Sequence, residues 1–181
     1  MLPGADYMST AQDAIYDAFA AILGLTANQA KAMIRYSWPD GKSVKFTATP
    51  DDDVCYIRLT AFPKPATGHI NAENIMVGDA MKKRYNMHIC VRADCIFYGP
   101  HAFDYAHQVF IGVHDPKARA VLAPAKMAAI PDEELPAPSR ELVDGRWYTR
   151  YDVGINFYML VVYQNDVDAL TEAPNIVIQK G

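Results

Sequence analysis

The stretch that decides the fold is RYNMHICVRADCIFY, residues 84–98. One set of alternate positions is occupied by Tyr85, Met87, Ile89, Val91, Ala93, Cys95 and Phe97, and the other by Arg84, Asn86, His88, Cys90, Arg92 and Asp94. Successive side chains of a β-strand point to opposite faces of its sheet, so this period of two predicts a strand with one apolar and one polar face. Such a strand would be longer than the usual strand of roughly five or six residues.

A second stretch, RWYTRYDVGINFYMLVVY at residues 146–163, has the same period. Its apolar face carries Trp147, Tyr151, Val153, Ile155, Phe157, Met159 and Val161, and its polar face carries Arg146, Arg150, Asp152 and Asn156. Residues 54–62 alternate as well and stop before Pro63, since proline cannot donate a hydrogen bond to a neighbouring strand. Shorter strands are predicted at residues 43–49 and 175–179.

Helical signals lie on both sides of the first long strand. Near the N-terminus, Thr10 is the predicted cap, and apolar residues then recur at steps of three and four up to Gly24, the expected end. A short second helix is predicted from Thr26 and Gln29, which have the spacing of a capping box. Two further helices should follow Gly99-Pro100 and Asp115-Pro116; the first has as its apolar face Phe103, Ala106, Phe110 and Val113, and the second covers residues 117–122.

These elements predict an α+β fold, in which helices pack on one face of a single antiparallel or mixed β-sheet with long loop arms. We expect one domain over residues 1–181, because a chain of this length is long enough for one well-buried core and short for two. Within it, residues 1–42 form a helical region, 63–81 and 124–145 are long loops, and 164–181 are a C-terminal extension. A short strand at 127–130 is a further prediction.

Composition narrows the class of function. The net charge is −4 and the pI about 5.7, which argues against a dedicated binder of the phosphate backbone. No apolar run approaches the length of roughly 18 residues needed to span a bilayer, and the first residues do not have the pattern of a signal peptide. The three cysteines, Cys55, Cys90 and Cys95, form no CxxC pair, so free thiols in a cytosol are expected.

The sequence contains no recognisable catalytic, cofactor-binding or metal-binding motif. His88 and Cys90 share a strand face, but zinc needs three or four ligands and no motif completes the set. The run from Asp51 to Asp53 lacks the alternating ligands and terminal Glu of a calcium loop and is better read as a turn. Neither a GxSxG elbow nor a phosphate-binding glycine loop occurs.

The polar face of the predicted sheet holds the candidate functional residues, Arg84, Arg92, Asp94, Arg150 and Asp152. Opposite charges on neighbouring strands can pair, each contributing about 0.2 to 1 kcal/mol. A face of this kind is either solvated or lies against another subunit. We expect these five residues to contribute to a subunit interface.

Three motifs resemble a known family. VRADCIFYGPHAFDYA, residues 91–106, is a strand that ends in an aromatic-glycine step and leads into a helix with small residues. APSR at 137–140 and WYTRYD at 147–152 fit a closing strand with an aromatic-x-x-Arg-x-Asp pattern, and the N-terminal helix is followed by Trp38-Pro39. In these features the chain resembles the neck or tail terminator proteins of tailed bacteriophages.

The resemblance implies a structural subunit rather than an enzyme, without a cofactor. It implies a homo-oligomeric ring, expected to be a hexamer, that caps the tail tube and joins it to the head–tail connector or adaptor. DNA would pass through the channel without sequence-specific binding, and the protein would be part of the virion, assembled in the host cytoplasm without a membrane.

Two alternatives stay open. One is another head–tail joining or tail-tube subunit of a phage. The other is a small hydrolase or metal- or ligand-binding domain that uses His88 and Cys90.

Overall fold

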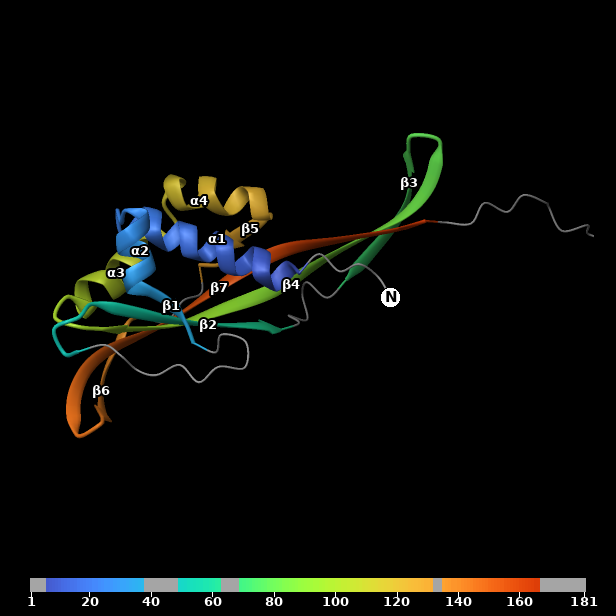
Figure 1. Ribbon diagram of the computed structural model, residues 1–181. Helices are drawn as coiled ribbons and strands as arrows, with labels where there is room; N and C mark the ends of the chain where they lie inside the picture. Colours follow the sequence, from blue (N-terminus) through green and yellow to red (C-terminus); the bar gives the residue numbers. More distant parts are fainter. Residues whose placement is uncertain (1–5, 38–48, 63–68, 132–134, 167–181) are drawn as a thin grey trace, which may run out of the picture.

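The fold is seen in a computed structural model that describes residues 6–37, 49–62, 69–131 and 135–166 (Figure 1). Its frame is a pair of long antiparallel strands, β4 (Ala80–Tyr98) and β7 (Arg146–Asp166). They pair without interruption from Lys82 opposite Asp166 to Tyr98 opposite Arg150. With 21 residues, β7 spans about 70 Å if fully extended. Both predicted long strands are confirmed, and each is longer than its alternation indicated.

Three shorter strands complete the body of the sheet. β2 (Val54–Phe62) pairs antiparallel with β4 and has the predicted bounds. β1 (Ile34–Tyr36) runs parallel to β2, and β5 (Met127–Ala129) lies antiparallel along β7. The order β1-β2-β4-β7-β5 contains one parallel pair, so the sheet is mixed. The strands predicted at 43–49 and 175–179 lie outside the described residues.

Two hairpin arms extend from opposite ends of the long strand pair (Figure 1). At one end β3 (Ile70–Val77) pairs with the start of β4, and at the other β6 (Ala137–Val143) pairs with the start of β7. The prediction of long loops at 63–81 and 124–145 was therefore wrong for the residues described in these segments, which are largely strand. Two-residue turns close both hairpins: Gly78, with φ +62°, begins one, while Asp144 and Gly145, with φ +49° and +77°, form the other.

The N-terminal helices follow their capping signals. α1 (Tyr7–Ile22) begins one turn earlier than predicted, because Asp6 rather than Thr10 caps it by accepting a hydrogen bond from the Ser9 amide at 3.0 Å. α2 (Ala27–Met33) begins with the predicted capping box, in which Thr26 and Gln29 each bond to the backbone of the other.

α3 (Ala102–Gly112) and α4 (Pro116–Leu122) follow β4, and the short 3-10 turn Ala123–Ala125 then leads to β5. The helices α1 and α3 approach so closely that a β-carbon on Gly112 would lie 2.4 Å from a methyl carbon of Ile22. α3 presents Ala102, Ala106 and Val109 to the core. Phe103, predicted to be buried, is exposed, because the small side chains of α3 make the close packing surface and turn Phe103 outward.

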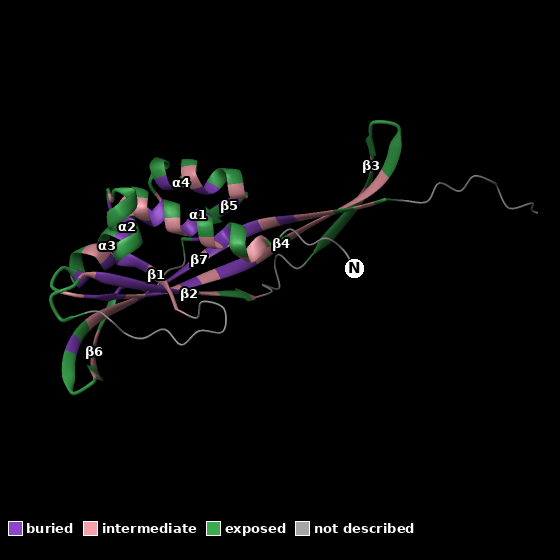
Figure 2. Cartoon of the chain, viewed as in Figure 1, coloured by how far each residue is buried: buried purple, intermediate pink, exposed green. Residues whose placement is uncertain are grey.

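The helices all cover one face of the sheet, as predicted, and this confirms the α+β class (Figures 1 and 2). The main core lies between that helical layer and the apolar faces of β2, β4 and β7, and includes Ile15, Phe19, Ile57, Phe97, Ile155 and Phe157. A small second cluster, of Val54, Tyr56, Tyr98 and Tyr148, lies on the opposite face, where the β6–β7 arm begins. Buried residues thus concentrate at the middle of the long strands, while the arms remain exposed (Figure 2).

Candidate subunit interface

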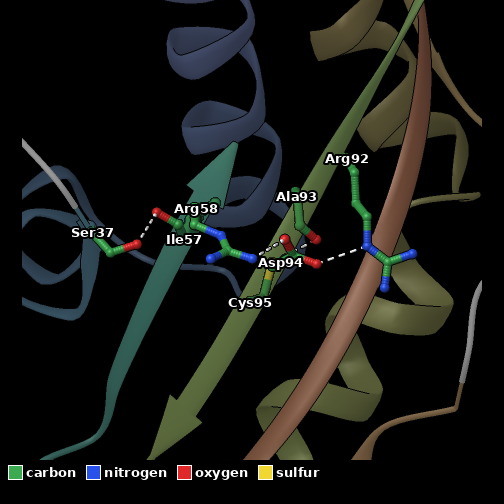
Figure 3. Close-up of polar contacts among 7 residues, drawn as sticks. All are labelled: Ser37, Ile57, Arg58, Arg92, Ala93, Asp94 and Cys95. Atoms are coloured by element: carbon green, nitrogen blue, oxygen red, sulfur yellow. Dashed lines mark hydrogen bonds and ion pairs between the residues drawn. The ribbon is translucent and has the colours of Figure 1, made fainter. Parts of the chain in front are cut away.

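Asp94 is held between two arginines on the face of the sheet opposite the helices (Figure 3). Arg58 lies directly across from it on β2, with Nη2 3.1 Å from Oδ2 of Asp94. Arg92 precedes it on the same face of β4 and donates from Nε to Oδ1 at 2.7 Å. The Asp94 side chain keeps 29% of its exposure, so solvent screens both pairs, and each contributes at most about 1 kcal/mol to stability.

Arg150 and Asp152 belong to a second cluster, at the base of the β6–β7 arm. Arg150 donates from Nη1 to Glu141 Oε2 at 2.7 Å and from Nη2 to Asp152 Oδ2 at 3.0 Å. The Tyr98 hydroxyl donates to the same Glu141 oxygen at 2.5 Å. These two donors, Tyr98 first, hold the pKa of Glu141 below its usual value, whereas burial and the bond to Glu141 raise the pKa of Tyr98 to about 12. The cluster ties the arm to β4.

Arg84 lies apart from both clusters, on the β3–β4 arm. It donates from Nε to Oε1 of its cross-strand partner Glu73 at 2.7 Å, and Asn86 donates to the same oxygen at 2.9 Å. Arg84 precedes Arg92 by eight residues of β4, a separation of about 26 Å along an extended strand. The five predicted residues therefore share a face of the sheet but form three separate clusters.

The charged residues that sequence analysis missed are the partners of those it found. Arg58, Glu73 and Glu141 each make a cross-strand ion pair with a predicted residue. Of these three residues only Arg58 lay on a predicted strand, and all three pairings depend on the register of β2, β3 and β6 against the long strands. Each of the three clusters contains an arginine donor and a carboxylate acceptor, and the side chains of both are partly exposed.

His88 and Cys90 are not arranged as a metal site. Cys90 is fully buried while His88 is exposed, and all three cysteines are free thiols in buried positions. Among the residues that the structure describes, no group of three or more His, Cys, Asp or Glu side chains is placed to hold a metal ion.

The turn at Asp52 and Asp53 has a structural role that agrees with the turn interpretation. Asp52 accepts hydrogen bonds from the amide and hydroxyl of Thr49 at 2.8 and 2.9 Å. Asp53 accepts from the backbone amide of His101 at 3.0 Å, and its other oxygen lies 2.8 Å from His101 Nδ1. This hydrogen bond and the charge of Asp53 raise the pKa of His101. The turn thereby fixes the residue at which α3 begins.

Exposed large apolar side chains lie mainly at the two ends of the sheet. Among the described residues they are Ile70, Met76, Val77 and Met81 in the β3–β4 arm, Leu135, Leu142 and Trp147 in or beside the β6–β7 arm, and Phe103 and Ile111 on α3. By strand alternation Trp147 and Met81 share the faces of β7 and β4 that carry the core residues Val153 and Val91, yet both are exposed. Two pairs among the exposed side chains are direct cross-strand neighbours, Met76 with Met81 and Leu142 with Trp147, and such exposed apolar pairs are candidate contacts with other molecules.

A hollow of about 350 Å³ adjoins Trp147 at the base of the β6–β7 arm. Its lining includes Pro50, Pro100, Phe103, Trp147, Thr149 and Tyr151. The rings of Phe103 and Tyr151 meet edge to face, with centroids 5.4 Å apart. The hollow is therefore aromatic, formed where the start of α3 meets β7.

The structure is thus a sheet with two projecting hairpins and exposed apolar residues at both ends, an arrangement typical of proteins that bind other chains. The chain matches the family described as phage neck terminator protein over residues 13–181, and it belongs to that family. The family consists of structural proteins of bacteriophages, which places the chain in the neck of the virion, where it interacts with other head or tail proteins. No curated protein matches the chain. In the described parts of the chain, none of the helices has both the length and the apolar character required to cross a membrane.

Proposed function

We propose that this chain is the subunit of a homo-oligomeric ring that caps the tail tube and joins it to the head–tail connector. The observation that carries the proposal is the pair of hairpin arms at opposite ends of one uninterrupted strand pair, since they give each subunit two distant and unlike contact surfaces. Unlike surfaces produce head-to-tail contacts, which close into rings when the rotation between subunits allows it. A hexamer is the expected ring, assembled in the host cytoplasm.

The acidic balance of the chain fits a channel through which DNA must move. The net charge is −4, and a strongly basic lining would instead hold phosphates through the release of counterions. We therefore expect DNA to pass without sequence-specific binding.

The charged face is proposed as part of the contact between subunits. Its charged groups are already paired with one another within the chain, so another subunit could cover them without leaving unpaired charges, although Arg150 Nε and Asp152 Oδ1 make no hydrogen bond to any of the described residues. Arg92 belongs to the first cluster and Arg150 to the second, and replacing both by glutamate places like charges beside Asp94 and Glu141. This change should prevent ring formation.

The test is a complementation assay with phage that lack the protein. Negative-stain images of wild-type reactions should show thin rings on tail ends and joined heads and tails, whereas the R92E/R150E variant should give separate heads and tails. The matched control is K31E/R119E, which makes the same charge change at exposed positions on α2 and α4. Circular dichroism must show that both variants are folded.

Two outcomes contradict the proposal. Normal joining by a folded R92E/R150E variant would remove the charged face from the interface. Long tubes built from the wild-type chain would instead identify a tail-tube subunit.

A further inference from the structure

We propose that the end of the β3–β4 arm of one subunit binds in the aromatic hollow beside Trp147 of the next subunit. The occupant of the hollow is thus a second copy of this chain. The inference rests on the proposed ring and names the two surfaces that would close it.

The end of the β3–β4 arm presents a projecting apolar pair. Met76 and Met81 are direct cross-strand partners, and they are 63% and 46% exposed. Only the short turn at Gly78 and Asp79 lies beyond the neighbouring pair. Methionine side chains are flexible and polarisable, and they make favourable contacts with aromatic rings. This end is therefore suited to an aromatic pocket.

The hollow at the opposite end offers the complementary shape. Trp147, which is 67% exposed, and Phe103, which is 51% exposed, both line it. Because both side chains are already partly covered, each would bury on the order of a further 100 Å² in the contact. A projecting end and a hollow fit each other better than either fits a copy of itself.

The charges beside the two surfaces are also complementary. On the arm, Lys83 follows Met81 by two residues, and Lys82 between them is already paired with Asp166 at 3.2 Å. Asp51 and Asp104 are the sequence neighbours of the lining residues Pro50 and Phe103 of the hollow. A second pair of opposite charges is formed by Asp79 at the arm turn and Arg146 next to Trp147 in the sequence. Complementary charge favours the correct pairing and orientation of two surfaces.

The two surfaces cannot meet within one subunit. They lie at opposite ends of the strand pair, which is held by 17 consecutive residue pairs between β4 and β7. A contact between them must therefore join different copies, and each copy retains a free arm and a free hollow until the ring closes.

Cross-linking of full-chain variants that each carry one added cysteine tests the contact. All three native cysteines are buried, so cysteines introduced at exposed positions will react selectively. Ala80→Cys places a thiol beside the arm end, and Thr149→Cys places one in the hollow. A mixture of the two variants, treated with a short flexible bis-maleimide, should give a covalent dimer, whereas each variant alone should stay monomeric. The double variant should give a ladder of larger oligomers.

The matched control replaces Ala80→Cys by Asn28→Cys, an exposed position on α2. The arm-plus-hollow mixture should give roughly tenfold more dimer than this control, which corresponds to about 1.4 kcal/mol of contact free energy. Adding Met81→Glu to the arm variant should abolish the excess, and adding Ile111→Glu, on the exposed side of α3, should not.

Dimers from Ala80→Cys alone would show that arms meet arms, and a mixture no better than the control would show no contact; either result overturns the inference. Wild-type rings on tail ends, seen in the same preparation, would then leave the proposed function intact. Absence of rings would instead count against that function.

Discussion

The guanidinium of Arg92 on β4 lies against Gly154 on β7, in the space that a side chain at position 154 would occupy. A β-carbon on Gly154 would come within 2.2 Å of Nη2 and 2.7 Å of Cζ of Arg92. Gly154 is the register partner of Asp94, the carboxylate that Arg92 contacts. A glycine in the interior of a strand weakens it, so the position of Arg92 gives this glycine a reason to be there.

Gly154→Ala should therefore displace Arg92 and lower the free energy of unfolding by about 1 kcal/mol, since a flexible side chain can move away. In an Arg92→Ala background the same change should raise it by about 0.5 to 1 kcal/mol, because alanine loses less backbone entropy than glycine. Urea denaturation of the four proteins measures this cycle. Equal effects in both backgrounds would show that Arg92 and Gly154 do not interact.

Gly99→Ala should be much more harmful. Gly99 has φ +110°, and a β-carbon there would lie 2.6 Å from the backbone oxygen of Asp52, which cannot move aside as a side chain can. We expect a loss of about 3 kcal/mol in unfolding free energy, from strain and from this clash. Thermal denaturation measures it, and Gly24→Ala is the control, because Gly24 has positive φ but open space around it. Similar losses in both variants would mean that the clash adds nothing.

His101 should titrate above the ordinary histidine pKa of about 6.5. Its charged form is favoured by Asp53, so this pair stabilises the fold below the ordinary pKa, and its contribution is lost as pH rises through the raised value. An NMR titration of the ring should show the pKa falling in Asp53→Asn and unchanged in Asp52→Asn, whose carboxylate bonds to Thr49 instead. An unchanged pKa in Asp53→Asn would contradict the assignment.

Tyr98→Phe should lower the free energy of unfolding by about 1.5 kcal/mol, because it removes a hydrogen bond to a carboxylate. The folded pKa of Glu141 is depressed, so the stability it contributes is present above its ordinary pKa and is lost as pH falls through the folded value. The variant should raise this pKa and thus lose less stability on acidification. Urea midpoints at neutral and acid pH measure both effects, and parallel pH dependence in the two proteins would refute the role of Tyr98.

The body of the sheet could be predicted because burial on one face imposes a period of two. In β2 and in the centres of β4 and β7 the helical layer lies over every second residue, and the alternation is visible there. β3 and β6 escaped prediction because most of their residues on both faces are exposed, which removes the pattern. Gly78-Asp79 and Asp144-Gly145 were nevertheless usable hairpin signals.

The candidate site was predictable by face but not by partner. Alternation assigned Arg92 and Asp94 to one side of the sheet, yet nothing local identified Arg58 as the residue opposite Asp94. Periodicity also assigned Trp147 to the apolar side. It cannot tell where along a strand the covering helices end, so the exposure of Trp147 required the structure.

The uninterrupted pairing of β4 and β7 fixes the distance between the turns of the two hairpin arms. The number of residues in each strand sets this distance. Deleting two consecutive residues of β4 together with their two register partners on β7 would therefore shorten it by about 7 Å and keep every side chain on its face. Deleting one residue from each strand would move the side chains at one end of the pair to the opposite face of the sheet. The distance between the molecules that bind the two arms can therefore change in evolution only in steps of two residues per strand.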